Sequence, residues 1–469
     1  MKGLSLQSQF PIGGLFQSAA NYDPFEEAGV LRASLDPTTL TAPADAPTVI
    51  TNVNISNVAN ILVHTPTKLY EYLRNSPYTR SDVTASIDID PTALVGGAIM
   101  WKGRYIYAHP EKVWSWNLGA SNVAVLNAGN LNLNIRKFCI AGDGNLYSAN
   151  YGGVDKYILE SGTTGNVANQ FAIDTGFTVR DLMWDGNYLV ILADNNAINT
   201  ASRVSGSYSC KVYFWDLSTT VSVPNQTWNI PGESYLIGGV YQDGAVHVFG
   251  ANGLYVCNFS TPPKTLIDKR TSAINKWPTN PYQITQSPHA IYWCNGETSG
   301  TGIYGYGSFP GQKNKIFYQP YLSPISATYA HSAIAYSDGA IVTGSNEPKL
   351  YLHNVGSTRG SLTVVNAPVV LDQPYTFSHI KVSLKKALTT GQGVTVRALN
   401  MNGDVISDTD TQSYAAAKPR KNLLFRYKAG TNTNPKFEDI SLSVTPLAGA
   451  EITRVSLYAT PLSDGEADL

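Results

Sequence analysis

The sequence predicts an all-β protein: a seven-bladed β-propeller, with six blades as the alternative count, followed by a small antiparallel β-sandwich. Three observations predict this fold. A unit of apolar strand, tight turn and aromatic strand recurs along the chain. Its period is close to that of propeller blades. The period stops before the last hundred or so residues, where strands with a different spacing follow.

Tight turns give the repeat its spacing. Asp-Gly stands between apolar runs at Asp143-Gly144, Asp185-Gly186, Asp243-Gly244 and Asp338-Gly339, and Lys102-Gly103 occupies the same place in an earlier unit. Gly accepts the positive φ that hairpin turns need, so these pairs predict hairpins. Gly103, Gly144 and Gly186 are 41 and 42 residues apart. Gly244 follows Gly186 by 58 residues, and a polar insert around 195–209 accounts for the excess.

Two weaker copies complete the set of seven. Ile291-Tyr292-Trp293 has Pro288-His289 where Asp-Gly would stand, and Ile61-Leu62-Val63 precedes an aromatic strand at 69–72. Four strands in each of seven units are typical of a propeller. We therefore expect the propeller to occupy residues 46–368.

The flanking regions differ from the repeat. Residues 1–45 predict an extended arm, whose apolar side chains, Phe10, Phe16 and Phe25 among them, favour docking on a neighbour. Residues 369–469 predict a β-sandwich with a short polar tail, because apolar residues alternate along several strands. The expected strands are 377–384, 394–399, 423–427, 440–444 and 452–458, with a turn at Asn402-Gly403.

Composition excludes some functions. Charged residues make up 14% and the formal net charge is -1, so a broad cationic surface for sequence-specific nucleic-acid binding is not expected. Cys139, Cys210, Cys257 and Cys294 fall in different units, which predicts buried free thiols. The first residues lack the apolar run of a signal peptide, and the longest apolar stretch, 94–101, is too short to span a membrane.

Several short patterns could carry chemistry, and each has a simpler structural explanation. Gly300-Thr301-Gly302-Ile303-Tyr304-Gly305 has dinucleotide-binding glycines, but no helix start follows it. The seven histidines are scattered, and the carboxylate pairs Asp88/Asp90 and Asp408/Asp410 lack the rest of a calcium loop. The basic run 418–428 is expected to be a solvated hairpin face. We predict no catalytic residue, no cofactor site and no metal site.

Aromatic side chains give the candidate binding surface. Six tryptophans fall on predicted strands, where packing between blades explains them: Trp101, Trp114, Trp116, Trp184, Trp215 and Trp293. Trp228 and Trp277 fall on predicted loops. The candidate interface or glycan contacts are therefore Trp228 and Trp277, together with Phe10, Phe16 and Phe25 of the arm.

The order of these parts resembles a known group of proteins. The arm sequence NYDPFEEAGVLRASLDPTTL (21–40), the blade sequences DGNLY (143–147) and KLYLHN (349–354), and YTFSHIKVSL (375–384) at the start of the last domain are similar to propeller structural proteins of tailed bacteriophages. The resemblance implies a multi-copy virion protein of the tail, such as a nozzle, hub or adjoining ring component. It also implies synthesis in the host cytoplasm.

We therefore expect a non-enzymatic virion protein whose copies form a homo-oligomeric ring. Its expected partners are other tail proteins. The first alternative is a propeller at the virion surface that binds a carbohydrate or receptor, with a host surface glycan as partner. The second alternative is a glycan-degrading propeller enzyme, which needs a carboxylate pair in its central channel.

Overall fold

The computed structural model describes most of the chain in segments. They are residues 4–9, 16–20, 33–55, 58–73, 78–83, 97–108, 112–118, 123–127, 137–150, 152–160, 163–196, 208–218, 223–269, 276–297, 302–308, 315–322, 329–337, 339–353, 359, 363–366, 369–400, 405–408, 412–413, 421–426 and 436–461. The chain divides into two compact units, residues 39–301 with 324–352, and residues 1–38 with 302–323 and 353–469. Phe10, Phe25, Asp88, Asp90 and the turn at Asn402-Gly403 lie outside the described residues.

The larger unit begins with five four-stranded antiparallel sheets, each formed by strands consecutive in the chain. The first five sheets are β4 (Val49–Ile55), β5 (Val58–His64), β6 (Leu69–Leu73) and β7 (Arg80–Asp82); β8 (Gly97–Trp101), β9 (Arg104–Ala108), β10 (Val113–Trp116) and β11 (Val123–Asn127); β12 (Phe138–Ile140), β13 (Leu146–Asn150), β14 (Gly153–Glu160) and β15 (Thr163–Ala172); β16 (Thr178–Trp184), β17 (Leu189–Asp194), β18 (Cys210–Trp215) and β19 (Gln226–Asn229); and β20 (Leu236–Gln242), β21 (Ala245–Gly250), β22 (Gly253–Cys257) and β23 (Lys264–Asp268).

Two further sets of strands follow. The short 3₁₀ helix η2 (Pro281–Gln283) leads into β24 (Ile284–Gln286) and β25 (Ala290–Cys294). The last sheet contains β28 (His331–Ser337), β29 (Ala340–Ser345), β30 (Leu350–His353) and, from the predicted arm, β3 (Thr38–Thr39). The backbone N–H of Leu40 donates to the carbonyl of Leu350 over 2.9 Å, which attaches this part of the chain to β30.

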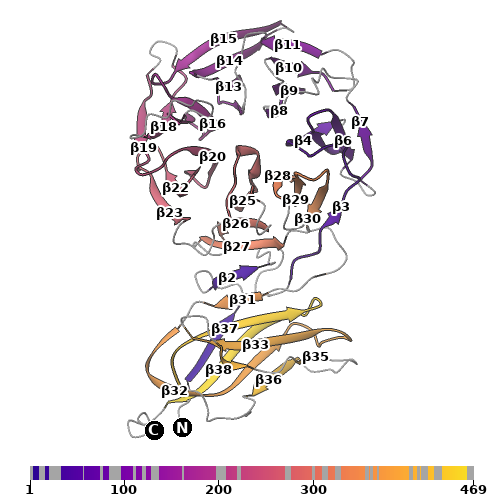
Figure 1. Cartoon of the computed structure of the whole chain (residues 1–469), viewed down its shortest axis with the longest axis vertical. Helices are drawn as coiled ribbons and strands as arrows, with labels where there is room; N and C mark the ends of the chain where they lie inside the picture. Colours follow the sequence, from indigo (N-terminus) through magenta and orange to yellow (C-terminus); the bar gives the residue numbers. More distant parts are fainter. Residues whose placement is uncertain are drawn as a thin grey trace. The chain divides into compact units, whose positions relative to one another are not determined.

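The first strands of these sheets form a closed cycle. We call β4, β8, β12, β16, β20, β24 and β28 the inner strands. Each contacts the next, and β28 contacts β4. Figure 1 shows the sheets around a ring, with β4, β8, β20 and β28 nearest its middle. This arrangement of antiparallel sheets around a ring is that of a β-propeller.

The core lies between neighbouring sheets. One apolar cluster joins Tyr147 and Phe171 of the third sheet to Leu182 and Trp215 of the fourth. Another joins Val190 and Phe214 of the fourth sheet to Val248 of the fifth. Both faces of these sheets are therefore covered, which explains why their strands are nearly continuous apolar runs. The six tryptophans predicted on strands all lie on strands of this unit, namely β8, β10, β16, β18 and β25.

The smaller unit contains the C-terminal strands and the start of the chain. Its main strand order is β1 (Leu4–Gln9), β38 (Ile452–Pro461), β32 (Val369–Leu384), β37 (Lys436–Leu447), β31 (Thr363–Asn366) and β2 (Phe16–Ala20). β33 (Gly393–Leu399) pairs with β34 (Val405–Asp408), β35 (Gln412–Ser413) and β37, β36 (Asn422–Arg426) pairs with β32, and β26 (Gly302–Ser308) pairs with β27 (Lys315–Leu322). The predicted strands of this region are present, and Ile380, Val382 and Val394 are buried on the alternating positions.

Two segments of the predicted arm are strands in this unit. β1 pairs antiparallel with β38 from Leu4↔Ala459 to Gln9↔Arg454, and β2 pairs antiparallel with β31. No helix among the described residues is long and apolar enough to cross a membrane.

The predicted hairpin turns are confirmed by their backbone. Gly144 has φ 73° and Gly244 has φ 78°, and Asp243 beside it is also positive at 53°. Two consecutive positive φ values are typical of the type I′ turn, which matches the twist of the flanking strands. A Cβ at either glycine would meet no atom within 4 Å. The need for glycine here is therefore conformational.

Replacing Gly144 or Gly244 by Val should lower the free energy of unfolding by on the order of 1–3 kcal/mol, because a β-branched residue is strained at positive φ. Urea unfolding measures the change. Gly152→Val is the matched control, since its Cβ would also meet open space but its φ is ordinary. Equal loss of stability in all three variants would show that the turn geometry is not the cause.

Candidate functional site: polar contacts between the propeller sheets

Asp181 on β16 joins the fourth sheet to the fifth. Its carboxylate accepts hydrogen bonds from the backbone N–H of Gly239 on β20 over 2.9 Å and of Leu182 over 2.8 Å. The side chain is buried, and burial raises the pKa of Asp181, opposed by the charge of Lys137 and by these two N–H donors. A Cβ at Gly238 would lie 2.9 Å from the same carboxylate and 2.8 Å from Cβ of Pro281. The absence of a side chain at Gly238 allows this close approach.

Asp194, at the end of β17, makes the second link between these sheets. Arg180 donates to it through Nε and Nη2 over 2.8 and 2.7 Å, and both side chains are buried. The same carboxylate accepts from the backbone N–H of Leu236, the first residue of β20, over 2.8 Å. Arg180 is the extra residue of a bulge in the β16–β17 pairing, which directs its side chain to this position. The ion pair is thus tied to the backbone of the neighbouring sheet.

Amide side chains link the later sheets in the same way. Nε2 of Gln242 on β20 donates to the carbonyl of Ser287, in the turn before β25, over 2.9 Å. Nε2 of Gln283 donates to the carbonyl of His331 on β28 over 2.6 Å. Asn52 on β4 donates to the carbonyl of Tyr336 on β28. These bonds continue around the ring to the first sheet.

Three indole N–H groups also bind backbone carbonyls of a neighbouring sheet. Trp101 on β8 donates to Gly144 over 3.0 Å, and Trp228 on β19 donates to Asn258 over 3.0 Å. Trp277 donates to Gly250 at the end of β21 over 2.7 Å. Each ring fills the space between two sheets and uses its polar edge as a link, a common role of buried tryptophan.

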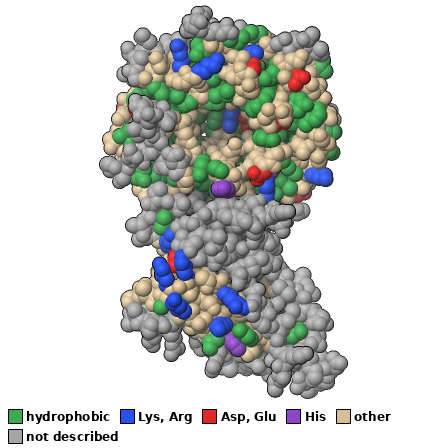
Figure 2. All heavy atoms as spheres, turned by 180° about the vertical axis from the view of Figure 1, so that it is seen from behind, with side chains coloured by type: hydrophobic (Ala, Val, Ile, Leu, Met, Phe, Trp, Pro, Cys, Tyr) green, Lys and Arg blue, Asp and Glu red, His purple; other side chains and the backbone are tan. Residues whose placement is uncertain are grey.

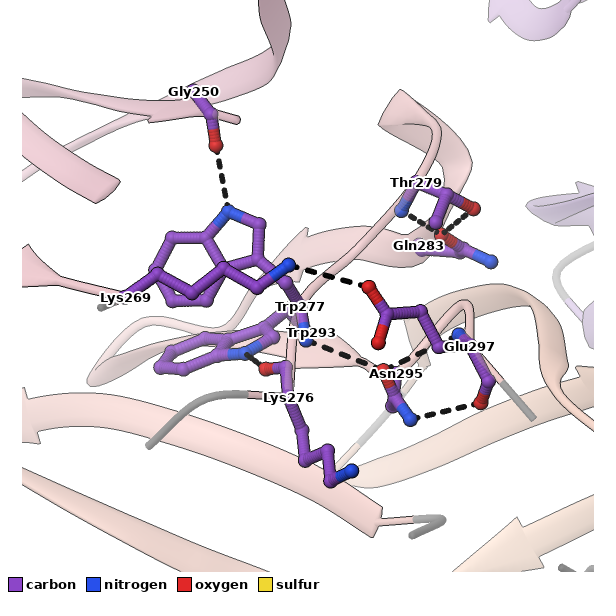
Figure 3. Close-up of polar contacts among 9 residues, drawn as sticks. All are labelled: Gly250, Lys269, Lys276, Trp277, Thr279, Gln283, Trp293, Asn295 and Glu297. Carbon is purple, nitrogen blue, oxygen red and sulfur yellow. Dashed lines mark hydrogen bonds and ion pairs between the residues drawn. The ribbon is translucent and has the colours of Figure 1, made fainter. Parts of the chain in front are cut away.

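The surroundings of Trp277 are shown in Figure 3. Its ring packs against Trp293 at 6.0 Å between centroids and against Phe249 at 5.5 Å. Asn295 accepts from the Trp277 backbone N–H over 3.2 Å and donates through Nδ2 to the carbonyl of Glu297 over 2.8 Å. Lys269 makes an ion pair with Glu297 at 3.2 Å. The packing and the bonds hold Trp277 beside β21 and β25.

The predicted binding tryptophans are therefore used inside the fold. Only 1% of the Trp277 surface is exposed, so this ring offers no face to a glycan, and its prediction as a contact residue is wrong for that reason. Trp228 lies on β19 rather than on a loop and packs against the apolar cluster of the fourth and fifth sheets. Phe16 is in β2, and Phe10 and Phe25 lie outside the described residues.

The buried Glu233 and the four cysteines are the next candidates for chemistry. Glu233 accepts from the backbone N–H groups of Ser234 and Asn252 and from the hydroxyl of Tyr255 over 2.8 to 3.0 Å. The four cysteines are free and buried, as predicted, and burial raises the pKa of Cys139 and of Cys257 to about 12. A thiol with such a pKa stays protonated at neutral pH and is a weak nucleophile. Among the described residues, no group of three or more His, Cys, Asp and Glu could hold a metal ion.

No protein-family model and no curated protein matches the chain. Among solved structures, it is similar to a chain in a crystal structure of the mitotic checkpoint complex, with 15% identity, a TM-score of 0.49 and coverage of 71% of this chain and 98% of that one. It is also similar to an inactive virginiamycin B lyase from Staphylococcus aureus with quinupristin (10% identity, TM-score 0.48, coverage 68% and 99%). A third is the Swd1 β-propeller domain of Myceliophteria thermophila (7% identity, TM-score 0.48, coverage 69% and 100%). At these levels the similarities give no information on function.

Replacing Arg180 by Met should destabilise the protein by about 3–5 kcal/mol, because Asp194 would remain buried without its cation. Urea unfolding at neutral pH measures the loss. Lys68→Met is the control: Lys68 pairs with Asp82 at 2.7 Å, but both side chains are about 40% exposed. Solvent screening makes such a pair contribute little, so this variant should unfold at the parent's urea midpoint. An Arg180→Met midpoint equal to that of the control would contradict a structural role for the buried pair.

Proposed function

We propose that this protein is a multi-copy structural component of the tail of a tailed-bacteriophage virion, and that it acts by assembly rather than by catalysis. We infer a propeller of seven blades and a C-terminal β-sandwich. The cyclic contacts of the inner strands support the blade count, and the alternating burial along β32 and β33 supports the sandwich.

One observation carries the assembly role: buried polar side chains of the propeller bind the backbone of the next sheet. Asp181, Asp194, Gln242 and Gln283 all do so. A carboxylate whose lone pairs accept backbone N–H bonds of the next sheet is held in one position and fixes that sheet in turn. This arrangement favours a rigid building block.

The sequence adds the context of a virion. The arm sequence at 21–40 and the order arm, propeller, C-terminal strands resemble phage propeller structural proteins. The low content of charged residues, 14%, suits a chain whose surface is largely covered by neighbours. A ring forms when one surface of a subunit binds a different surface of the next and the rotation closes. A homo-oligomeric tail ring with other tail proteins as partners is the assembly we propose.

The proposal predicts where the protein is found. Particles from the source lysate are banded on a density gradient, separated into heads and tails, and quantified by mass spectrometry. The protein should be present in the tail fraction in stoichiometric amount, because a ring component is present in fixed copy number. Lysate of the same host without phage is the control. Recovery only from the soluble part of the lysate would overturn the virion role.

A further inference from the structure

Three tyrosines repeat along the second half of the propeller. Tyr235, Tyr282 and Tyr329 are spaced at 47-residue intervals. Each stands one or two residues before an inner strand, namely β20, β24 and β28. These strands are consecutive in the cycle of inner strands. The three tyrosines therefore stand at the same end of neighbouring strands.

Hydrogen bonds between loops place them on one face of the ring. The carbonyl of Tyr235 accepts from Ala251, which follows β21, over 3.1 Å. The carbonyl of Ala330, beside Tyr329, accepts from Asn346, which follows β29, over 3.0 Å. Both contacts join the loop before an inner strand to the loop after the second strand of the same sheet. We call this side of the ring the tyrosine face.

Two of these rings are open to solvent. Tyr235 is 40% exposed and Tyr329 is 36% exposed, while Tyr282 is partly buried. The Asp-Gly turns follow the opposite ends of the inner strands, so they lie on the other face. The tyrosine face thus carries flat apolar rings with hydroxyl edges, the type of side chain that is enriched at binding surfaces.

A lysine reaches this array from the other side of the ring. Lys137 directly precedes β12, which is three steps from β24 in the cycle in one direction and four in the other. Its ammonium nitrogen nevertheless lies 5.1 Å from the centroid of the Tyr282 ring. The Lys137 side chain therefore crosses the middle of the ring. Figure 2 shows a hollow there, with Lys or Arg atoms inside it.

The charge of this lysine has little compensation from the protein. The carboxylate of Asp181 is near enough to influence it, but it is buried and its bonds go to the N–H groups of Gly239 and Leu182. In the described part of the chain, Lys137 makes no ion pair with a carboxylate. An ammonium over an aromatic ring remains able to bind an anion from solvent.

We propose that the tyrosine face and Lys137 bind an acidic sugar, with the sugar carboxylate on the Lys137 ammonium and its C–H faces on the rings of Tyr282, Tyr235 and Tyr329. A sugar acid combines the two properties that the surface offers, a flat apolar face and an anionic group beside it. The combination of aromatic surface with one placed charge is typical of ligand sites. This inference rests on the propeller itself and holds whether or not the protein belongs to a virion.

Titration calorimetry on the purified full chain tests the site. The acidic probe is a tetrasaccharide of alternating glucuronate and N-acetylglucosamine; the neutral probe is cellotetraose, and inorganic phosphate is the plain anion. The parent should bind the acidic tetrasaccharide at least about tenfold more tightly than either of the other two, because a hydrogen bond to a charged group contributes about that factor.

Single-residue variants measure how much Lys137 and Tyr235 each contribute to binding of the acidic tetrasaccharide. Lys137→Met should weaken binding of the acidic tetrasaccharide about tenfold, and Tyr235→Ser about threefold to tenfold, the range expected for loss of one aromatic contact. Lys102→Met is the matched control, because Lys102 also stands over an aromatic ring, the indole of Trp101 at 5.2 Å, but in a turn on the opposite face. It should bind as the parent does. If Lys137→Met does not fold, the exposed Tyr235→Ser variant decides the test.

Several outcomes would contradict the proposed acidic-sugar site. Binding of cellotetraose as tight as that of the acidic tetrasaccharide would remove the role of the lysine. Phosphate binding of the same strength would reduce the site to a simple anion contact without the tyrosines. An acidic peptide that binds while the tetrasaccharide does not would show that the face recognises a protein. Because no particle is involved, none of these results depends on the tail fractionation.

Discussion

Strand pairing in this propeller lies within each sheet, and the rest of the structure depends on that constraint. Side chains therefore join neighbouring sheets, beside one backbone bond among the described residues, from the N–H of His331 to the carbonyl of Asn295 over 3.1 Å. Apolar packing supplies most of the contact, as in the cluster of Tyr147, Phe171 and Trp215. Packing alone is non-directional. Hydrogen bonds from side chains to the backbone of the next sheet add direction and fix how the sheets meet.

The same constraint explains where buried polar residues lie. An inner strand is the edge strand of its sheet. Its N–H and C=O groups that do not pair within the sheet need other partners when they are buried. Asp181 provides an acceptor for Gly239, and Gln283 provides a donor for the carbonyl of His331. The carboxylate of Asp181 and the amide of Gln283 thereby join the edge strand of one sheet to its neighbour. The tyrosine face is different, because the rings of Tyr235 and Tyr329 are open to solvent.

The local part of the fold could be predicted from the sequence, while the contacts between sheets could not. Asp-Gly turns are local signals, and Gly144 and Gly244 have the positive φ that they predict. Asp181 and Gly239 are 58 residues apart, and no local pattern marks a carboxylate that will bind a distant N–H. The burial of Trp277 could not be predicted for the same reason: it lies on a loop, as its polar neighbours predict, but Phe249 and Trp293 pack against its ring. The 47-residue interval between Tyr235, Tyr282 and Tyr329 is close to the length of a blade. It could therefore have predicted that the three tyrosines occupy equivalent positions in successive sheets.

The measurement that tests this account most directly is amide hydrogen exchange at Gly239, read by NMR on the parent and on Asp181→Ala. Gly239 lies on β20, the edge strand of its sheet, and its N–H donates to Asp181. The account predicts slow exchange at Gly239 in the parent and much faster exchange in the variant, with Val248 on β21 protected in both. Fast exchange at Gly239 in the parent, or no change on removing Asp181, would contradict the claim that side chains of one sheet hold the backbone of the next.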